Sequence, residues 1–150
     1  MLEPGAKLPV ITVADDTGKE FSTKALLGKP LVLYFYPKDD TPGCTNEATQ
    51  FRDYYDFFEK KGAQIVGVSR DSAAAHAKFK SKYELPFRLL ADVDSALCDA
   101  FGVIVEKTMS GRTSMGLQRS TFLFDRGGEL IRVWPKVRVD GHAEDVLAAV

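Results

Sequence analysis

Cysteine and histidine are scarce in this sequence. Its only cysteines are Cys44 and Cys98, and its only histidines are His76 and His142. They form neither a C-x-x-C motif nor a Cys/His cluster, so we expect no zinc site and no dithiol redox motif. The phosphate-binding patterns G-x-G-x-x-G and G-x-x-x-x-G-K-[ST] are also absent. We therefore expect no nucleotide, metal or other cofactor.

Net charge and long apolar runs are limited as well. The net charge is −1, with Lys and Arg spread along the chain, which does not predict a nucleic-acid interface. No apolar run approaches the roughly 20 residues of a membrane span, and residues 1–13 lack the pattern of a signal peptide. We therefore expect a cytoplasmic protein without a nucleic-acid or membrane partner. In the reducing cytoplasm both cysteines should rest as thiols.

What the sequence does contain is an alternation of strand and helix patterns over one domain, residues 1–150. Strands are predicted at 8–13, 31–36, 64–69, 87–92, 120–125 and 129–134, and helices at 44–61, 73–83, 93–101 and 141–150. The run LVLYFY is continuously apolar, as in a central strand buried on both faces. The Arg-Gly-Gly sequence between the last two strands predicts a hairpin. This order predicts an α/β domain with a central mixed sheet and helices on both faces.

Cys44 stands at the start of a predicted helix, shortly after the central strand 31–36. Ligands of open α/β sheets bind at the carboxyl ends of strands, and a helix N-terminus offers unpaired N–H groups and partial positive charge. Both features stabilise a thiolate, the reactive form of cysteine. Asp39 and Asp40 oppose it, because a close like charge disfavours the thiolate. The chemistry requires that both acids face solvent or pair with Lys38 or an arginine.

Arg119, just before the strand 120–125, is the best candidate for a cation that faces the Cys44 sulfur. A strand beside the central one would bring it to the same edge of the sheet. The alternative is that Cys44 is a buried structural residue, since it shares an apolar helix face with Ala48 and Phe51 and free cysteines are often buried. Local position alone supports the two interpretations about equally.

The spacing of Pro37, Thr41 and Cys44 matches the pattern P-x-x-x-T-x-x-C, and the segment YPKDDTPGCTNEA resembles the active-site loop of peroxiredoxins. The resemblance is to the bacterioferritin-comigratory protein or peroxiredoxin Q (PrxQ) type. It extends from about Gly5 to the C-terminal helix and includes GKPLVLYFYP, IVGVSRDS and RSTFLFD. The family carries its catalytic arginine at the place that Arg119 occupies here.

This resemblance implies a thioredoxin-like fold and an antioxidant thiol peroxidase acting on hydrogen peroxide and organic hydroperoxides. The Cys44 thiolate would attack one peroxide oxygen and become a sulfenic acid. Arg119 and helix N–H groups would stabilise the leaving oxygen, Thr41 would hydrogen-bond through its hydroxyl, and Pro37 would fix the loop and shield the sulfur. The implied partners are hydroperoxides and a thiol reductant such as thioredoxin, glutaredoxin or glutathione. The implied assembly is a monomer.

The chain departs from the family pattern in its second cysteine. Many members carry a resolving cysteine five residues after the reactive one, where this chain has Thr49, and others carry it in the next helix, where residues 73–83 have none. Only Cys98 remains as a candidate. It lies off the main apolar stripe of the predicted helix 93–101, so we expect it to be partly accessible. We favour a packing role for Cys98 over a resolving role, which predicts one-cysteine chemistry with an external thiol.

Other polar residues receive structural interpretations. Glu47 is predicted to support the first turn of its helix, and His76 and His142 are expected on helix surfaces or in caps. A second functional class stays open, because a reactive Cys44 could also form mixed disulfides in a peroxide-sensing or interaction protein. A thiol–disulfide oxidoreductase is disfavoured, since Thr41 stands where a C-x-x-C motif would have its first cysteine.

Overall fold

A computed structural model describes all residues of the chain, 1–150. The elements are β1 Thr12–Asp15, β2 Glu20–Ser22, the 3-10 helix η1 Thr23–Leu26, β3 Leu31–Phe35, α1 Pro42–Asp53, α2 Tyr55–Lys60, β4 Gln64–Ser69, α3 Ala73–Tyr83, β5 Arg88–Ala91, α4 Ala96–Phe101, β6 Ile104–Met109, β7 Arg112–Leu117, β8 Ser120–Phe124, β9 Leu130–Trp134 and α5 His142–Ala149. None of the helices combines the length and the apolar character that crossing a lipid bilayer requires.

Seven strands form one mixed sheet in the order β2-β1-β5-β4-β3-β8-β9. The neighbours β3, β4 and β5 run parallel, and the other neighbouring pairs are antiparallel. All five residues of β3 are buried, as the LVLYFY run predicts. The predicted α/β class with a central mixed sheet is therefore confirmed.

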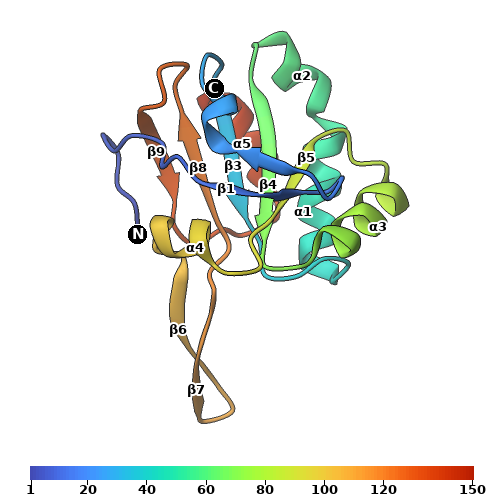
Figure 1. Ribbon diagram of the computed structural model, residues 1–150, viewed down its shortest axis with the longest axis vertical. Coiled ribbons are helices and arrows are strands. Elements are labelled where there is room, and N and C mark those ends of the chain that lie inside the picture. The colour runs from blue at the N-terminus through green and yellow to red at the C-terminus, as the bar shows by residue number, and fades with distance from the viewer.

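Side chains of β3 alternate between the two faces of the sheet, as in any strand. Leu33 and Phe35 enter a core that α4 and η1 cover, whereas Val32 and Tyr34 enter a core under α1, α2, α3 and α5. Figure 1 shows helices on both faces of the sheet, as predicted. Burying one large apolar side chain contributes about 1.5–3 kcal/mol, so these two cores hold the helices against the sheet.

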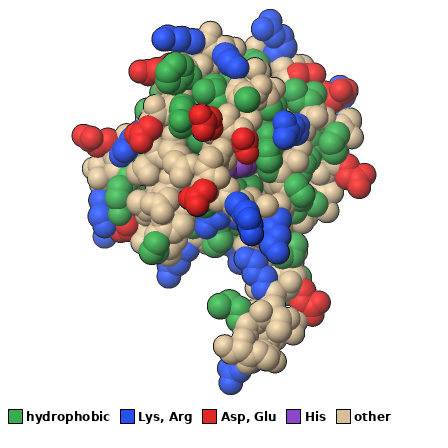
Figure 2. All heavy atoms as spheres, turned by 180° about the vertical axis from the view of Figure 1, so that it is seen from behind, with side chains coloured by type: hydrophobic (Ala, Val, Ile, Leu, Met, Phe, Trp, Pro, Cys, Tyr) green, Lys and Arg blue, Asp and Glu red, His purple; other side chains and the backbone are tan.

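A two-stranded hairpin, β6–β7, was not predicted from the sequence. Its two-residue loop, Ser110–Gly111, has positive φ at both positions, as a type I′ turn requires. The hairpin extends away from the body (Figure 1), and most of its side chains are exposed. It therefore lacks the apolar pattern that marks the sheet strands. Lysine and arginine side chains gather where it joins the body (Figure 2).

Several predicted boundaries are wrong. The first strand begins at Thr12, well after Pro9, which has no N–H group to donate to a sheet. The helix predicted after the central strand begins earlier, at Pro42, and is interrupted at Tyr54, whose φ and ψ are −96° and 1°. α4 begins only after Ser95, whose left-handed φ of 62° excludes that residue from the helix. The short strand β2 was also not predicted.

Candidate active site

Cys44 lies in the first turn of α1, which follows the carboxyl end of β3 through a short loop. Thr41 is the N-cap residue and Pro42 is the first helical residue, where the missing proline N–H is harmless. The N–H groups of Gly43 and Cys44 have no hydrogen-bond acceptor in the protein, as is general for the first turn of a helix. The side chain of Cys44 is nevertheless buried, with 1% of its surface exposed.

The register of the sheet brings Arg119 to Cys44. β8 runs antiparallel to β3 with Ser120 opposite Phe35, so the residue before Ser120 lies at the carboxyl end of β3. There the Arg119 Nη2 lies 3.4 Å from the Cys44 Sγ. The cysteine is thus buried, as a packing role requires, and also faces a cation, which a packing role does not explain. A guanidinium at this distance stabilises a thiolate.

Gly43 makes room for this contact. A Cβ atom added at Gly43 would lie 3.1 Å from the Arg119 Nη2, which is closer than ordinary van der Waals contact. A side chain at this position would therefore require the guanidinium to shift by a few tenths of an ångström. The backbone conformation of Gly43 is ordinary helix, so the glycine is explained by space and not by its φ angle.

Glu47 is a site residue whose role the sequence interpretation underestimated. Its Oε1 accepts a hydrogen bond of 2.8 Å from the Arg119 Nη1, and its side chain is 1% exposed. The guanidinium therefore joins Cys44 to Glu47. Burial alone would lower the pKa of Arg119, but the charges of Glu47 and Cys44 raise it above its usual value. The i, i+3 spacing of Cys44 and Glu47, which places both on one helix face, was the available signal.

The Glu47 carboxyl group lies in an apolar surrounding. Burial raises its pKa to about 7, although the charge and hydrogen bond of Arg119 act in the opposite direction. Its second oxygen, Oε2, has no hydrogen-bond partner, and neither has the buried hydroxyl of Tyr34. Burial, followed by the charges of Glu47 and Cys44, raises the pKa of Tyr34 well above its usual value. Glu47 can therefore gain or lose a proton near neutral pH.

Thr41 and Pro37, the other two residues of the motif, lie in the loop before Cys44. The Thr41 hydroxyl donates a hydrogen bond of 2.8 Å to the carbonyl oxygen of Lys38 and makes none to the sulfur. Pro37 is exposed, between the end of β3 and the acidic pair of the loop. The structure therefore brings Arg119 into contact with Cys44, while Thr41 and Pro37 shape the loop that leads to it.

The two acids of the loop are paired with α3, not with Lys38 or an arginine. Asp39 lies 2.7 Å from the Nδ1 of His76. Asp40 forms an ion pair of 2.7 Å with Lys82 and accepts a hydrogen bond of 2.6 Å from the Tyr83 hydroxyl. Both acids are thus partnered, which removes the main objection to a thiolate at the start of α1.

Both histidines are buried, so the expectation of surface or capping histidines is wrong. His76 is fully buried and His142 is 4% exposed, and Figure 2 shows only a small histidine area on its face of the molecule. The His142 Nε2 lies 2.8 Å from the Thr121 hydroxyl. Burial lowers the pKa of His142 to about 4, so its ring is neutral at neutral pH. His76 thus links α3 to the loop before α1 and to β5, and His142 links α5 to β8.

Cys98 is fully buried, so the expectation of partial accessibility is wrong. α4 is short, and Leu97, Cys98 and Phe101 all pack into the core on one face of the sheet. Cys44 belongs to the core on the opposite face. Burial, followed by the hydrogen bond and charge of Asp92, raises the pKa of the Cys98 thiol well above its usual value. Both cysteines are free thiols, and the sheet separates them.

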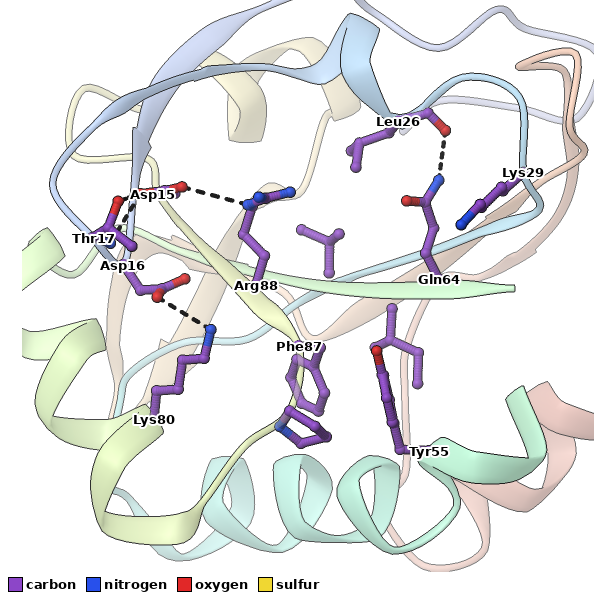
Figure 3. A pocket seen from close by; sticks show the side chains of 13 residues that line it. Asp15, Asp16, Thr17, Leu26, Lys29, Tyr55, Gln64, Lys80, Phe87 and Arg88 are labelled. Atoms are coloured by element: carbon purple, nitrogen blue, oxygen red, sulfur yellow. Dashed lines mark hydrogen bonds and ion pairs between the residues drawn. The ribbon is translucent and has the colours of Figure 1, made fainter. Parts of the chain in front are cut away.

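A polar pocket of about 360 Å³ lies at another edge of the sheet (Figure 3). Its acidic groups are already paired, Asp15 with Arg88 at 3.4 Å and Asp16 with Lys80 at 3.2 Å. The pocket lies where β4 and β5 begin, whereas Cys44 follows the end of β3, which runs parallel to them. The pocket is therefore separate from the Cys44 site.

Comparisons with known proteins agree with this geometry. Residues 4–133 match the AhpC/TSA family. The chain is 47% identical to peroxiredoxin Bcp of Bacillus subtilis over 146 residues, covering 97% of this chain and 93% of the relative. It is 49% identical to peroxiredoxin Bcp of Xanthomonas campestris over 133 residues, covering 89% of this chain and 83% of the relative.

A solved structure gives the same result for the fold. The structure of the Xanthomonas campestris bacterioferritin comigratory protein, which was studied for its alkyl peroxide reduction activity, superposes with a TM-score of 0.89. The two sequences are 44% identical, and the match covers 95% of this chain and 94% of the other. The thioredoxin-like peroxiredoxin fold is thereby confirmed. The chain belongs to the AhpC/TSA family and is a peroxiredoxin of the Bcp and peroxiredoxin Q type.

Proposed function

We propose that this protein is a thiol peroxidase that reduces hydrogen peroxide and organic hydroperoxides through a sulfenic acid on Cys44. The observation that carries the proposal is the Arg119 guanidinium 3.4 Å from the Cys44 Sγ, at the N-terminus of α1. The alkyl peroxide reduction activity named for the Xanthomonas campestris relative supports organic hydroperoxides as substrates.

In the first half of the reaction, the Cys44 thiolate attacks one oxygen of the peroxide. An S–O bond forms, the O–O bond breaks, and the other oxygen leaves as hydroxide or alkoxide, which takes a proton to become water or an alcohol. The sulfur is oxidised to a sulfenic acid and the peroxide is reduced. Arg119 and the free N–H groups of Gly43 and Cys44 are suited to stabilise the charge that develops on the leaving oxygen.

Thr41 and Pro37 support this step from the loop. The Thr41 hydroxyl, held by the Lys38 carbonyl, keeps its own lone pairs free to accept a hydrogen bond from a bound hydroperoxide. Pro37 restricts the backbone of the loop and limits the access of water to the sulfur. Glu47 orients the guanidinium of Arg119 through their 2.8 Å contact.

In the second half, an external thiol reduces the sulfenic acid. One thiol forms a mixed disulfide with Cys44 and releases water, and a second thiol regenerates Cys44 and leaves as a disulfide. Thr49 hydrogen-bonds to the Thr45 carbonyl at 2.9 Å and offers no sulfur, and Cys98 is buried on the other face of the sheet. Thioredoxin, glutaredoxin or glutathione would serve as the reductant of a monomeric, cytoplasmic antioxidant enzyme.

Stopped-flow measurement of Cys44 oxidation by hydrogen peroxide and by cumene hydroperoxide tests the proposal. Cys44→Ser should abolish the reaction, and Cys98→Ser should retain it. Oxidation no faster than that of a free thiol such as glutathione would contradict the peroxidase. Repeated turnover with thioredoxin or glutathione would distinguish an enzyme from a sensor, which stops at a mixed disulfide.

A further inference from the structure

The loop before Cys44 is anchored by a buried network that the mechanism has not used. Asp39 contacts His76 of α3 at 2.7 Å and accepts a hydrogen bond of 2.6 Å from the Tyr36 hydroxyl. The backbone N–H of Asp39 donates to the Asp71 Oδ2 at 2.9 Å, and the Ser69 hydroxyl donates to the same oxygen. The side chains of Asp39 and His76 are 6% and 0% exposed. Through Asp39 the loop is therefore tied to α3 and to the connection between β4 and α3.

The hydrogen bonds define how many protons this pair holds. The His76 Nε2 lies 2.9 Å from the Leu90 carbonyl oxygen, and because a carbonyl only accepts, Nε2 carries a proton. The 2.7 Å separation of Nδ1 and the Asp39 carboxylate oxygen requires one further proton between them, since two lone pairs at this distance repel. Whether it resides on the ring or on the carboxylate, the pair has no net charge. His76 thus cancels the charge of Asp39 without exposing either group to water.

The position of Asp39 connects this pair to the thiol. Asp39 precedes Asp40, whose backbone has a left-handed φ of 55°, and Asp40 precedes Thr41, the N-cap of α1. A shift of Asp39 would therefore pass through two residues to the first turn of the helix. After burial and the charge of Glu47, the charges of Cys44 and Asp39 both raise the pKa of the buried Tyr34, so a charge on either group acts on the same hydroxyl.

We propose that His76 and Asp39 are positioning residues for Cys44, and that His76 keeps a buried carboxylate from opposing the thiolate. The proposal rests on the thiol peroxidase function proposed above. Asp39, Asp71 and His76 each offer an atom that could bind a metal ion, and these atoms lie within 4.8 Å of one another. They already make hydrogen bonds to each other or to Tyr36, Ser69 and Leu90. We therefore assign the cluster to loop positioning and not to metal binding.

His76→Gln is the variant that tests the charge. It removes the compensating proton and leaves the buried Asp39 carboxylate with the Tyr36 hydroxyl as its side-chain partner, and the loss of a cationic partner is costly for a buried acid. The pH at which the Cys44 thiolate forms, followed by thiolate absorbance, should rise by about one unit, and peroxide oxidation at a pH below that midpoint should slow about tenfold. The double variant His76→Gln/Asp39→Asn removes the acid as well. Its rate should stay within about threefold of the wild type, which corresponds to a shift of less than about half a pH unit in the thiolate midpoint.

The outcomes separate the two proposals. A wild type that reacts no faster than a free thiol contradicts the peroxidase. A fast wild type with His76→Gln equally fast, or with the double variant as slow as His76→Gln, contradicts the role of His76. Asp53→Asn, which breaks the exposed pair with Arg52 at the other end of α1, is the matched control and should leave the thiolate titration unchanged. Unfolding temperatures verify that each variant is folded at the assay temperature.

A second measurement does not depend on the folding of a His76 variant. Coupling between two groups is reciprocal, so a thiolate at Cys44 must also influence the proton shared by His76 and Asp39. The ring ¹⁵N chemical shifts of His76 should therefore differ between wild type and Cys44→Ser at a pH where the thiolate is formed. Identical shifts in the two proteins would contradict the proposal, while an observed difference supports it.

Discussion

Arg119 and Glu47 form a buried ion pair of 2.8 Å, and the same guanidinium extends its second nitrogen to the Cys44 sulfur at 3.4 Å. One arginine thus connects a thiol and a carboxyl group that are one helical turn apart on α1. Glu47, which the P-x-x-x-T-x-x-C pattern does not include, thus helps to set the orientation of the cation.

Replacing Arg119 by methionine should slow the reaction of Cys44 with hydrogen peroxide by about 100-fold, because a preorganised donor to a developing oxyanion is typically worth that factor or more. Stopped-flow kinetics under excess peroxide would give the rate constant. Arg126→Met, which removes an exposed arginine from the β8–β9 turn, is the matched control. Equal rates for Arg119→Met and the control would refute the role of Arg119.

Gly43→Ala should separate activity from stability. Alanine is favoured over glycine in a helix by up to about 1 kcal/mol, so the unfolding temperature should stay level or rise. The new Cβ would lie 3.1 Å from the Arg119 Nη2 and would require the guanidinium to shift slightly. Peroxide oxidation should therefore slow by up to about tenfold, because a misplacement of a full ångström in an active site costs about 100-fold. Gly127→Ala, at an exposed glycine with ordinary φ, should leave the rate unchanged.

Glu47 predicts a pH dependence of stability. Burial raises its pKa from 4.5 to about 7, so the folded protein holds this proton more tightly than the unfolded chain does. The contribution of protonated Glu47 to the free energy of unfolding is fully present below pH 4.5, and it is lost as the pH rises from there through 7. The shift corresponds to at most about 3 kcal/mol.

Urea unfolding at pH 4.5 and pH 7.5 measures this contribution. The fall in the free energy of unfolding between the two pH values should be larger for the wild type than for Glu47→Gln, because glutamine does not ionise. Other titrating groups are common to both proteins and cancel in the comparison. Glu59→Gln, at an exposed position of α2, should behave like the wild type. The same fall in all three proteins would show that Glu47 does not carry the effect.

Cys98 should take no part in catalysis. Intact mass after one equivalent of hydrogen peroxide should show an added oxygen or a Cys44-linked dimer, and not the loss of two hydrogens that an internal disulfide gives. Cys98→Ala should keep the rate of peroxide oxidation and lower the free energy of unfolding by about 1 kcal/mol, since it removes one buried heavy atom. A mass lower by two hydrogens in the wild type, absent in Cys98→Ala, would instead show that Cys98 resolves Cys44.

Much of the site follows from local sequence. The apolar run at 31–36, the loop that follows it and the helical pattern that starts at Cys44 predict a cysteine at a helix N-terminus beside the carboxyl end of a strand. Arg119 was singled out because it precedes a strand that could lie next to β3. Each of these inferences depends on a pattern that spans only a few residues, and such patterns reflect backbone preferences directly.

Other features depend on contacts between distant segments. His76 shares one helix face with Phe79 through their i, i+3 spacing, and both are buried. The groups that its ring meets depend on packing, because α3 places it against Asp39 and the end of β5. The β6–β7 hairpin has no apolar face by which to recognise it. Cys98 lies in a helix so short that three of its six residues are buried, so its position relative to an apolar stripe said little about exposure.

The sequence by itself determined the alternation of strands and helices, the place of Cys44 at a helix start and the family to which the chain is related. The tertiary structure decided which charges meet. Hydrophobic periodicity acts within an element, whereas an ion pair such as Arg119–Glu47 or Asp39–His76 requires a particular register and packing angle between elements. Only the packed structure therefore shows that the acids of the loop are neutralised and that the two thiols lie on opposite faces of the sheet.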